Sequence, residues 1–120
     1  MTSVLIVDDS LAIAKKLEGI IEASEGFTFA GRGADGADGL AQYRAKNPDI
    51  VLMDLVMPNM DGLTAIRMIT AFDKAAKIIV LSSVAGISDK VEEALKFGAK
   101  LVLSKPFTDE SVLSALNSVL

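Results

Sequence analysis

Runs of consecutive apolar residues alternate along this chain with segments in which apolar residues recur at every third or fourth position. Val4–Val7 and Ile50–Met53 are apolar at every position, which is typical of strands that are covered on both faces of a sheet. The segment after the first run has helical spacing instead, with apolar residues at Leu11, Leu17 and Ile21. The pattern therefore predicts buried strands that alternate with amphipathic helices.

Carried along the whole chain, this reading predicts five strands and five helices. The strands are expected at Val4–Val7, Phe27–Ala30, Asp49–Asp54, Lys77–Leu81 and Lys100–Ser104. The helices are expected at about Leu11–Ala23, Ala37–Lys46, Leu63–Phe72, Val91–Leu95 and Asp109–Leu120. Ser10 is a plausible N-cap for the first helix, and Pro48 disfavours helical geometry in the residue before it.

Strict alternation of strands and helices favours an α/β fold, a parallel sheet between two layers of helices. The 120 residues suffice for one domain with its own core and are too few for two. We see no internal repeat and no linker, and we expect residues 1–120 to form a single domain with no room for an output domain. In such folds, ligands bind at the carboxyl ends of the strands.

Composition removes several classes of function. The chain has no cysteine and no histidine, which excludes disulfides, thiolate chemistry and the usual zinc ligands. A net charge of −4 disfavours a nucleic-acid surface. No apolar run approaches the length of a membrane span, and Met1–Ser3 lacks the features of a signal peptide. We therefore expect a cytoplasmic protein whose chemistry uses Asp, Glu, Lys, Ser, Thr or backbone groups.

Acidic residues follow two of the buried strands directly. Asp8 and Asp9 come after the first strand, Asp54 ends the third, and Lys105 follows the fifth. If these strands are parallel neighbours, three carboxylates and one ammonium group converge at one edge. Two unit charges 4 Å apart cost about 4 kcal/mol at an effective dielectric near 20, so such a cluster needs a cation, and oxygen ligands suit Mg²⁺, Mn²⁺ or Ca²⁺.

Each of these residues also has an ordinary interpretation when it is taken alone. Acids before a helix commonly cap it, Gly62 after Asp61 is most simply a turn glycine, and Ser82 and Lys105 would be a loop hydroxyl and a solvated lysine. What changes this interpretation is that the unusual residues fall on one edge of the predicted sheet.

Together they would make a device for phosphoryl transfer. An ionised carboxylate such as Asp54 is a nucleophile that needs no base. A metal ion held by Asp9 and Asp54 would cancel the repulsion between that carboxylate and an incoming phosphoryl group. Lys105 would hold a second phosphoryl oxygen, and the Ser82 hydroxyl or a nearby backbone N–H would hold a third. The product is an acyl phosphate on Asp54.

Four motifs resemble the receiver domain of two-component response regulators, in order and over the whole chain. They are Val7–Ser10, Asp49–Gly62, Ile79–Ser83 and Lys105–Phe107. The resemblance implies a flavodoxin-like sheet with the strand order 2-1-3-4-5.

The resemblance also implies the role of each site residue. Asp54 is then the phosphoacceptor and Lys105 the family's lysine, and Ser82 matches the switch hydroxyl. Asp9 would ligate Mg²⁺ directly, Asp8 would hold a metal-bound water, and the backbone carbonyl of Val56 would complete the protein ligands, with Mn²⁺ as an alternative metal. The Lys105–Pro106 bond is expected to be cis, and Asp61 is not a ligand.

The partners follow from the same resemblance. A sensor histidine kinase or a histidine phosphotransfer protein would donate the phosphoryl group, and an unknown downstream protein would read the surface formed by the fourth helix, the fifth strand and the fifth helix. Lys90, Lys96, Lys100 and Val102 are expected near that surface, although the lysines are equally explained as ordinary solvated side chains. We expect a monomer without direct contact to nucleic acid or membrane, with a dimer left open, and no enzymatic activity beyond self-phosphorylation and slow dephosphorylation.

The sequence departs from the family pattern at the switch. Val102 stands where the family often has an aromatic residue, and Ser83 is an alternative to Ser82 as the switch hydroxyl. The Ala85–Gly86 region carries what looks like one extra residue. Val56 and Val84, the positions that tune phosphoryl lifetime in the family, are apolar and cannot orient an attacking water, so we expect slow self-dephosphorylation.

Three other functions compete with this one. A phosphatase of the haloacid-dehalogenase type needs a general acid two residues after its nucleophile, where this chain has Val56. A flavodoxin-like phosphate binder needs a neutral loop, and Asp8 and Asp9 would repel phosphate. A degenerate receiver that only docks a partner usually lacks a core acid or the lysine, and this chain has them all.

Overall fold

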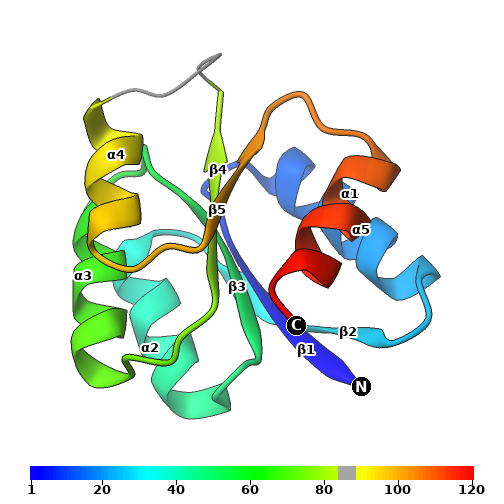
Figure 1. The fold of residues 1–120 in the computed structure, drawn as a ribbon, viewed down its shortest axis with the longest axis horizontal. Coiled ribbons are helices and arrows are strands. Elements are labelled where there is room, and N and C mark those ends of the chain that lie inside the picture. Colours follow the sequence, from blue (N-terminus) through cyan, green and yellow to red (C-terminus); the bar gives the residue numbers. More distant parts are fainter. Residues whose placement is uncertain (84–88) are drawn as a thin grey trace.

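The computed structural model describes residues 1–83 and 89–120, and these form a parallel sheet between two layers of helices (Figure 1). The strands are β1 (Thr2–Val7), β2 (Phe27–Gly33), β3 (Ile50–Asp54), β4 (Ile78–Ser82) and β5 (Leu101–Ser104). The helices are α1 (Leu11–Ala23), α2 (Gly36–Lys46), α3 (Gly62–Phe72), α4 (Asp89–Lys96) and α5 (Asp109–Ser118). The strand order is β2-β1-β3-β4-β5, which confirms the predicted α/β fold and its topology.

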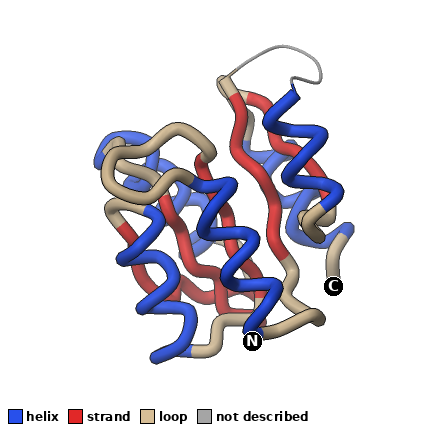
Figure 2. The backbone as a smooth tube through the Cα atoms, turned by 90° about the vertical axis from the view of Figure 1, so that its left-hand side faces the viewer, coloured by secondary structure: helices blue, strands red, loops and turns tan. Residues whose placement is uncertain are grey.

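Each face of the sheet has its own hydrophobic core, because successive side chains of a strand point to opposite faces. Val4 and Ile6 of β1 pack with α1 and α5, whereas Leu5 and Val7 pack with the layer of α2, α3 and α4. Figures 1 and 2 show these helix layers on either side of the strands. The strands β3 and β4 are buried at every residue, which confirms that the uninterrupted apolar runs are strands covered on both faces.

Strand β2 is longer than the sequence pattern predicts. It continues from the expected end at Ala30 to Gly33, although glycine is a poor strand former. The ladder with β1 extends it, since Ile6 pairs with Arg32 and Val7 with Gly33. Tertiary pairing therefore overrides local propensity here, and the extension carries Arg32 to the carboxyl edge of the sheet.

Helix ends differ from prediction by one or two residues. Helices α2 and α3 begin one residue earlier than expected, because Asp35 and Asp61 are their N-caps and accept hydrogen bonds from the backbone N–H of Asp38 and Thr64. Helix α5 ends at Ser118 rather than at Leu120. Asp61 thus lies directly ahead of a helix and caps it.

Gly62 does more than form a turn. A Cβ added to it would overlap the carbonyl oxygen of Asp54, and its backbone N–H donates to the carbonyl of Leu55 at 3.0 Å. The start of α3 therefore lies directly against the end of β3. Only glycine allows this approach, which fixes the backbone on which the Asp54 side chain is mounted.

We predict that Gly62→Ala lowers the free energy of unfolding by roughly 1–3 kcal/mol, because the added methyl group forces apart two packed backbone segments. Gly19→Ala is the matched control. Gly19 is exposed on α1, and no atom lies within 4 Å of the position that the new methyl group would take, so the change should stabilise by about 0.5–1 kcal/mol. Urea denaturation measures both, and equal effects of the two variants would contradict the prediction.

Candidate functional site

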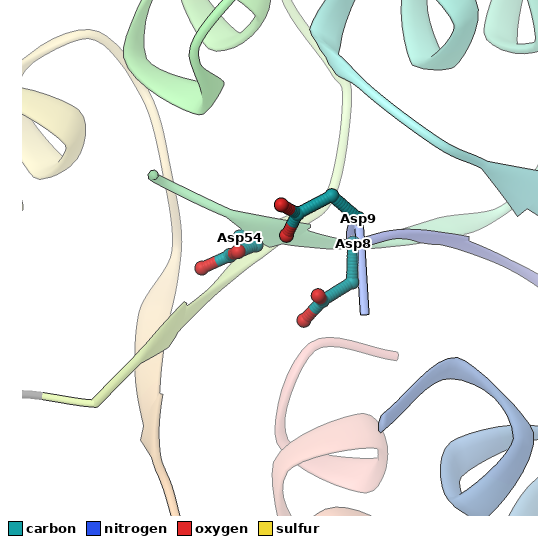
Figure 3. A group of neighbouring side chains, drawn as sticks. All are labelled: Asp8, Asp9 and Asp54. Atoms are coloured by element: carbon teal, nitrogen blue, oxygen red, sulfur yellow. The ribbon is translucent and has the colours of Figure 1, made fainter. Parts of the chain in front are cut away.

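Three carboxylates meet at the carboxyl edge of the sheet. Strands β1 and β3 pair in parallel with Val7 opposite Met53, so the residues that follow, Asp8 and Asp9 on one strand and Asp54 on the other, emerge side by side. One oxygen of each carboxylate lies within 4.8 Å of the others. Figure 3 shows the three side chains projecting together from the ends of their strands. The predicted convergence of the acids is therefore present.

Lys105 reaches into this cluster from the end of β5. Its Nζ lies 2.9 Å from Oδ2 of Asp8 and 3.5 Å from Oδ1 of Asp54. The peptide bond between Lys105 and Pro106 is cis, as predicted. The lysine is therefore an ion-pair partner in the site rather than an ordinary solvated surface residue.

Burial makes the cluster electrostatically strained. Asp8 is fully buried and also accepts a hydrogen bond from the backbone N–H of Ser10 at 2.9 Å. Burial and then the charge of Asp8 raise the pKa of Asp54, against the lowering effect of Lys105. One ammonium group faces three carboxylates, so negative charge remains in excess. Asp9, by contrast, is exposed.

This donor set fits a divalent cation with a preference for oxygen ligands. Three carboxylates in one small cluster, with neither histidine nor cysteine in the chain, suit Mg²⁺ or Mn²⁺. Asp8, Asp9 and Asp54 are the residues that would hold the ion. The backbone carbonyl of Val56 stays a prediction, and the Val56 side chain is 71% exposed.

A cleft of about 590 Å³ opens beside the cluster. Its lining combines the ends of β3 and β4, the start of α4 and the lysine: Asp54, Leu55, Val56, Leu81, Ser82, Ser83, Asp89, Lys90 and Lys105. Ser82 is the last residue of β4 and is 6% exposed, whereas Ser83 is exposed. Both serines thus line the same cleft as Asp54, and which of them is the switch stays a prediction.

The departures from the family pattern have different outcomes. Val102 lies in β5, and its partly buried side chain packs against the core on the α2, α3 and α4 face. Val84 and the Ala85–Gly86 region lie outside the described residues.

Some residues around the site were missed by sequence reasoning. Asn59 donates a hydrogen bond from Nδ2 to Oδ2 of Asp35 at 2.7 Å, and the backbone N–H of Gly36 donates to the carbonyl of Met60 at 2.8 Å. These contacts join the β2–α2 loop to the β3–α3 loop. Arg32 donates to the backbone carbonyls of Asp8 and Asp9. In the sequence, these contacts were indicated only by the polar residues that follow the second and third predicted strands, among them Arg32, Asp35 and Asn59.

Comparison with known proteins agrees with this geometry. The family model of the response regulator receiver domain matches residues 4–117. The chain belongs to this family.

Relatives and solved structures support the same family over nearly the full chain. The chemotaxis protein CheY of Treponema pallidum is 44% identical over 98% of this chain and 81% of its own length. The CheY of Thermotoga maritima is 43% identical, with 97% and 95% covered.

Among solved structures, a CheX–CheY complex with BeF3 and Mg²⁺ from Borrelia burgdorferi matches with a TM-score of 0.90 at 39% identity, covering 98% of this chain and 88% of that one. CheY4 of Vibrio cholerae matches with a TM-score of 0.91 at 30% identity, covering 100% and 99%.

The chain is therefore a receiver domain of the CheY type, the class that serves phosphorelay signal transduction. This result sets aside the phosphatase and flavodoxin-like alternatives. Within residues 1–83 and 89–120, the structure contains no helix with both the length and the apolar character needed to cross a bilayer.

The raised pKa of Asp54 gives a stability prediction for metal-free protein. At pH 7 the folded state carries a carboxylate whose charge it disfavours, so Asp54→Asn should raise the free energy of unfolding. The folded wild type takes up a proton as the pH falls through the raised pKa of Asp54. The difference in unfolding free energy between the variant and the wild type should therefore shrink as the pH falls towards 3.8, the ordinary pKa of an aspartate. Urea titrations in EDTA across this range measure it.

Glu25→Gln is the control for this experiment, because it removes one negative charge from an exposed turn. The change in unfolding free energy that it causes is the reference for the effect at Asp54. An Asp54→Asn protein that is less stable than wild type at pH 7 would rule the interpretation out.

Proposed function

We propose that this protein receives a phosphoryl group on Asp54 from a phosphohistidine and thereby switches a binding surface. The observation that supports this most directly is the cluster of Asp8, Asp9 and Asp54, with Lys105 paired to Asp8 and Asp54. The donor would be a sensor histidine kinase or a histidine phosphotransfer protein. The full set of core acids and the lysine favours this function over phosphorylation-independent docking.

In the proposed reaction, a carboxylate oxygen of Asp54 attacks phosphorus. The O–P bond forms, the N–P bond of the donor breaks, and its electron pair stays on the histidine nitrogen. The ammonium group of Lys105, 3.5 Å from Asp54, is placed to hold a phosphoryl oxygen. Asp8, Asp9 and Asp54 would hold a Mg²⁺ ion, which supplies charge neutralisation between carboxylate and phosphoryl group.

The switch would begin at the Ser82 hydroxyl, since Ser82 and Asp54 line the same cleft. A bond from Ser82 to a phosphoryl oxygen would bias the connection from β4 to α4 and thus the α4–β5–α5 surface. Moving a two-state equilibrium from 1:99 to 99:1 takes about 5.5 kcal/mol. A few charge-assisted hydrogen bonds of about 1.5–3 kcal/mol each are of that order.

The remaining parts of the proposal concern setting and partners. The protein would catalyse only its own phosphorylation and slow dephosphorylation, act in the cytoplasm as a monomer, and control a downstream protein. The Borrelia CheY, at 39% identity, is found with CheX, BeF3 and Mg²⁺. By analogy, we propose that this chain also takes Mg²⁺ and the phosphoryl mimic.

Incubation with acetyl phosphate and MgCl₂, followed by mass spectrometry of the intact protein and its peptides, tests the proposal. We expect one added phosphoryl group on Asp54, and none in Asp54→Asn or in EDTA. Glu25→Gln, an exposed acid remote from the cluster in sequence, should be modified like wild type. An unmodified wild type, or modification at another side chain, would contradict the assignment.

The lifetime of the phosphoryl group gives a separate prediction. The exposed apolar side chain of Val56 at the rim of the cleft cannot orient a water, so wild type should lose phosphate slowly. Val56→Asn should accelerate the loss by roughly tenfold, which corresponds to about 1.4 kcal/mol in the barrier. Decay of radiolabelled protein after removal of the donor measures the rate. Fast loss from wild type without a phosphatase would refute the hypothesis.

A further inference from the structure

A β-bulge in β2 determines which way Arg32 points. Val4 pairs with Phe29, but the next residue, Leu5, pairs with Gly31, so Ala30 is an extra residue in β2. Gly31 has a φ of +148°, a conformation that favours glycine. Because side chains alternate along a strand, one extra residue turns every later side chain to the opposite face.

The bulge therefore places Arg32 on the α1 side of the sheet. Arg32 is in register with Ile6, which belongs to the core beneath α1 and α5. The connection from β1 to α1 runs over this same face and carries Asp8 and Asp9. Without the bulge, the register would direct Arg32 to the opposite face, towards α2 and α3.

From this position the guanidinium group holds the backbone of the acidic pair. Its Nε and Nη2 donate to the carbonyl oxygen of Asp8 at 3.2 and 3.0 Å, and Nη2 also donates to the carbonyl of Asp9 at 3.1 Å. A planar fork of donors suits two successive carbonyls, and a lysine ammonium cannot reproduce it.

Arg32 and Lys105 thus bind different groups of the acidic residues. Lys105 pairs with the carboxylates of Asp8 and Asp54, whereas the described hydrogen bonds of the Arg32 side chain go to backbone carbonyls and leave the carboxylates available. The backbone N–H of Asp8 donates to the carbonyl of Gly33, and the carbonyl of Asp8 accepts from Arg32. The carboxylate of Asp8 accepts from the backbone N–H of Ser10 and from Lys105. The side chain of Asp9 is exposed, and the hydrogen bond from Arg32 to its carbonyl restrains its backbone.

We propose that Arg32 is a positioning residue for the divalent-cation site and increases its affinity for Mg²⁺. The inference rests on the cation site of the proposed function. Two effects of Arg32 oppose each other. Its charge repels a cation nearby, whereas its hydrogen bonds hold Asp8 and Asp9 in place. The direction of change on removing Arg32 therefore decides between positioning and simple electrostatics.

The test is a titration of the full chain with MgCl₂, followed by the backbone amide resonances of Asp9 and Ser10. Removing a residue that orients metal ligands typically costs 10- to 100-fold in affinity, so Arg32→Gln should raise the Kd for Mg²⁺ by about tenfold or more. Arg32→Lys keeps the charge that repels a cation but loses the fork of donors, so its Kd for Mg²⁺ should also rise. In acetyl phosphate assays, both should need more Mg²⁺ for half-maximal rate and approach the wild-type rate at saturation.

Arg44→Gln is the matched control. It makes the same change on α2, where the guanidinium lies over the Phe72 ring, and it should leave the Kd unchanged. Thermal unfolding of all variants checks that they fold. An Arg32→Gln protein that binds Mg²⁺ as tightly as wild type, or more tightly, overturns the proposal even if it is less stable. Failure of the proposed function would show instead as wild-type protein that binds Mg²⁺ and is not phosphorylated on Asp54.

Discussion

The packing of β1 against β3 holds together side chains that repel each other. Asp8 and Asp54 are mounted on neighbouring strands whose apolar residues are fully buried, and burying each such side chain contributes roughly 1.5–3 kcal/mol. Repulsion between two carboxylates about 4 Å apart costs about 4 kcal/mol at an effective dielectric near 20. The central strands can therefore enforce a cluster of charges that would separate in a flexible loop.

This enforced cluster gives the site its chemical character. Lys105 offsets part of the negative charge, yet burial and Asp8 still raise the pKa of Asp54. A divalent cation is the natural complement of this charge. In the proposed function, a phosphoryl group added to Asp54 would change the charge balance again. The buried strands hold the acids in place while the charge at the edge of the sheet can change, which suits the proposed phosphorylation switch.

The residues around the cluster shape the backbone that carries the acids and take no part in the proposed chemistry themselves. Gly62 lets α3 begin against the carbonyl of Asp54, and Gly31 allows the bulge that turns Arg32 towards α1. The pair of Asn59 and Asp35 joins two loops beside the site. Local sequence patterns do not predict the structure at these positions, because the backbone there is shaped to hold the acids. Such departures from local patterns are expected near functional sites.

The sequence by itself determined the alternation of strands and helices, the parallel sheet and the edge at which Asp8, Asp9, Asp54 and Lys105 meet. These features depend on the period of the apolar residues and on the direction of parallel strands, both of which are local or follow from simple topology. Only the tertiary structure decided the length of β2, its bulge, and the contacts of Arg32 and Asn59. The reason is that the register between β1 and β2 is set by pairing and packing of residues more than 20 positions apart, and one inserted residue reverses the face to which a side chain points.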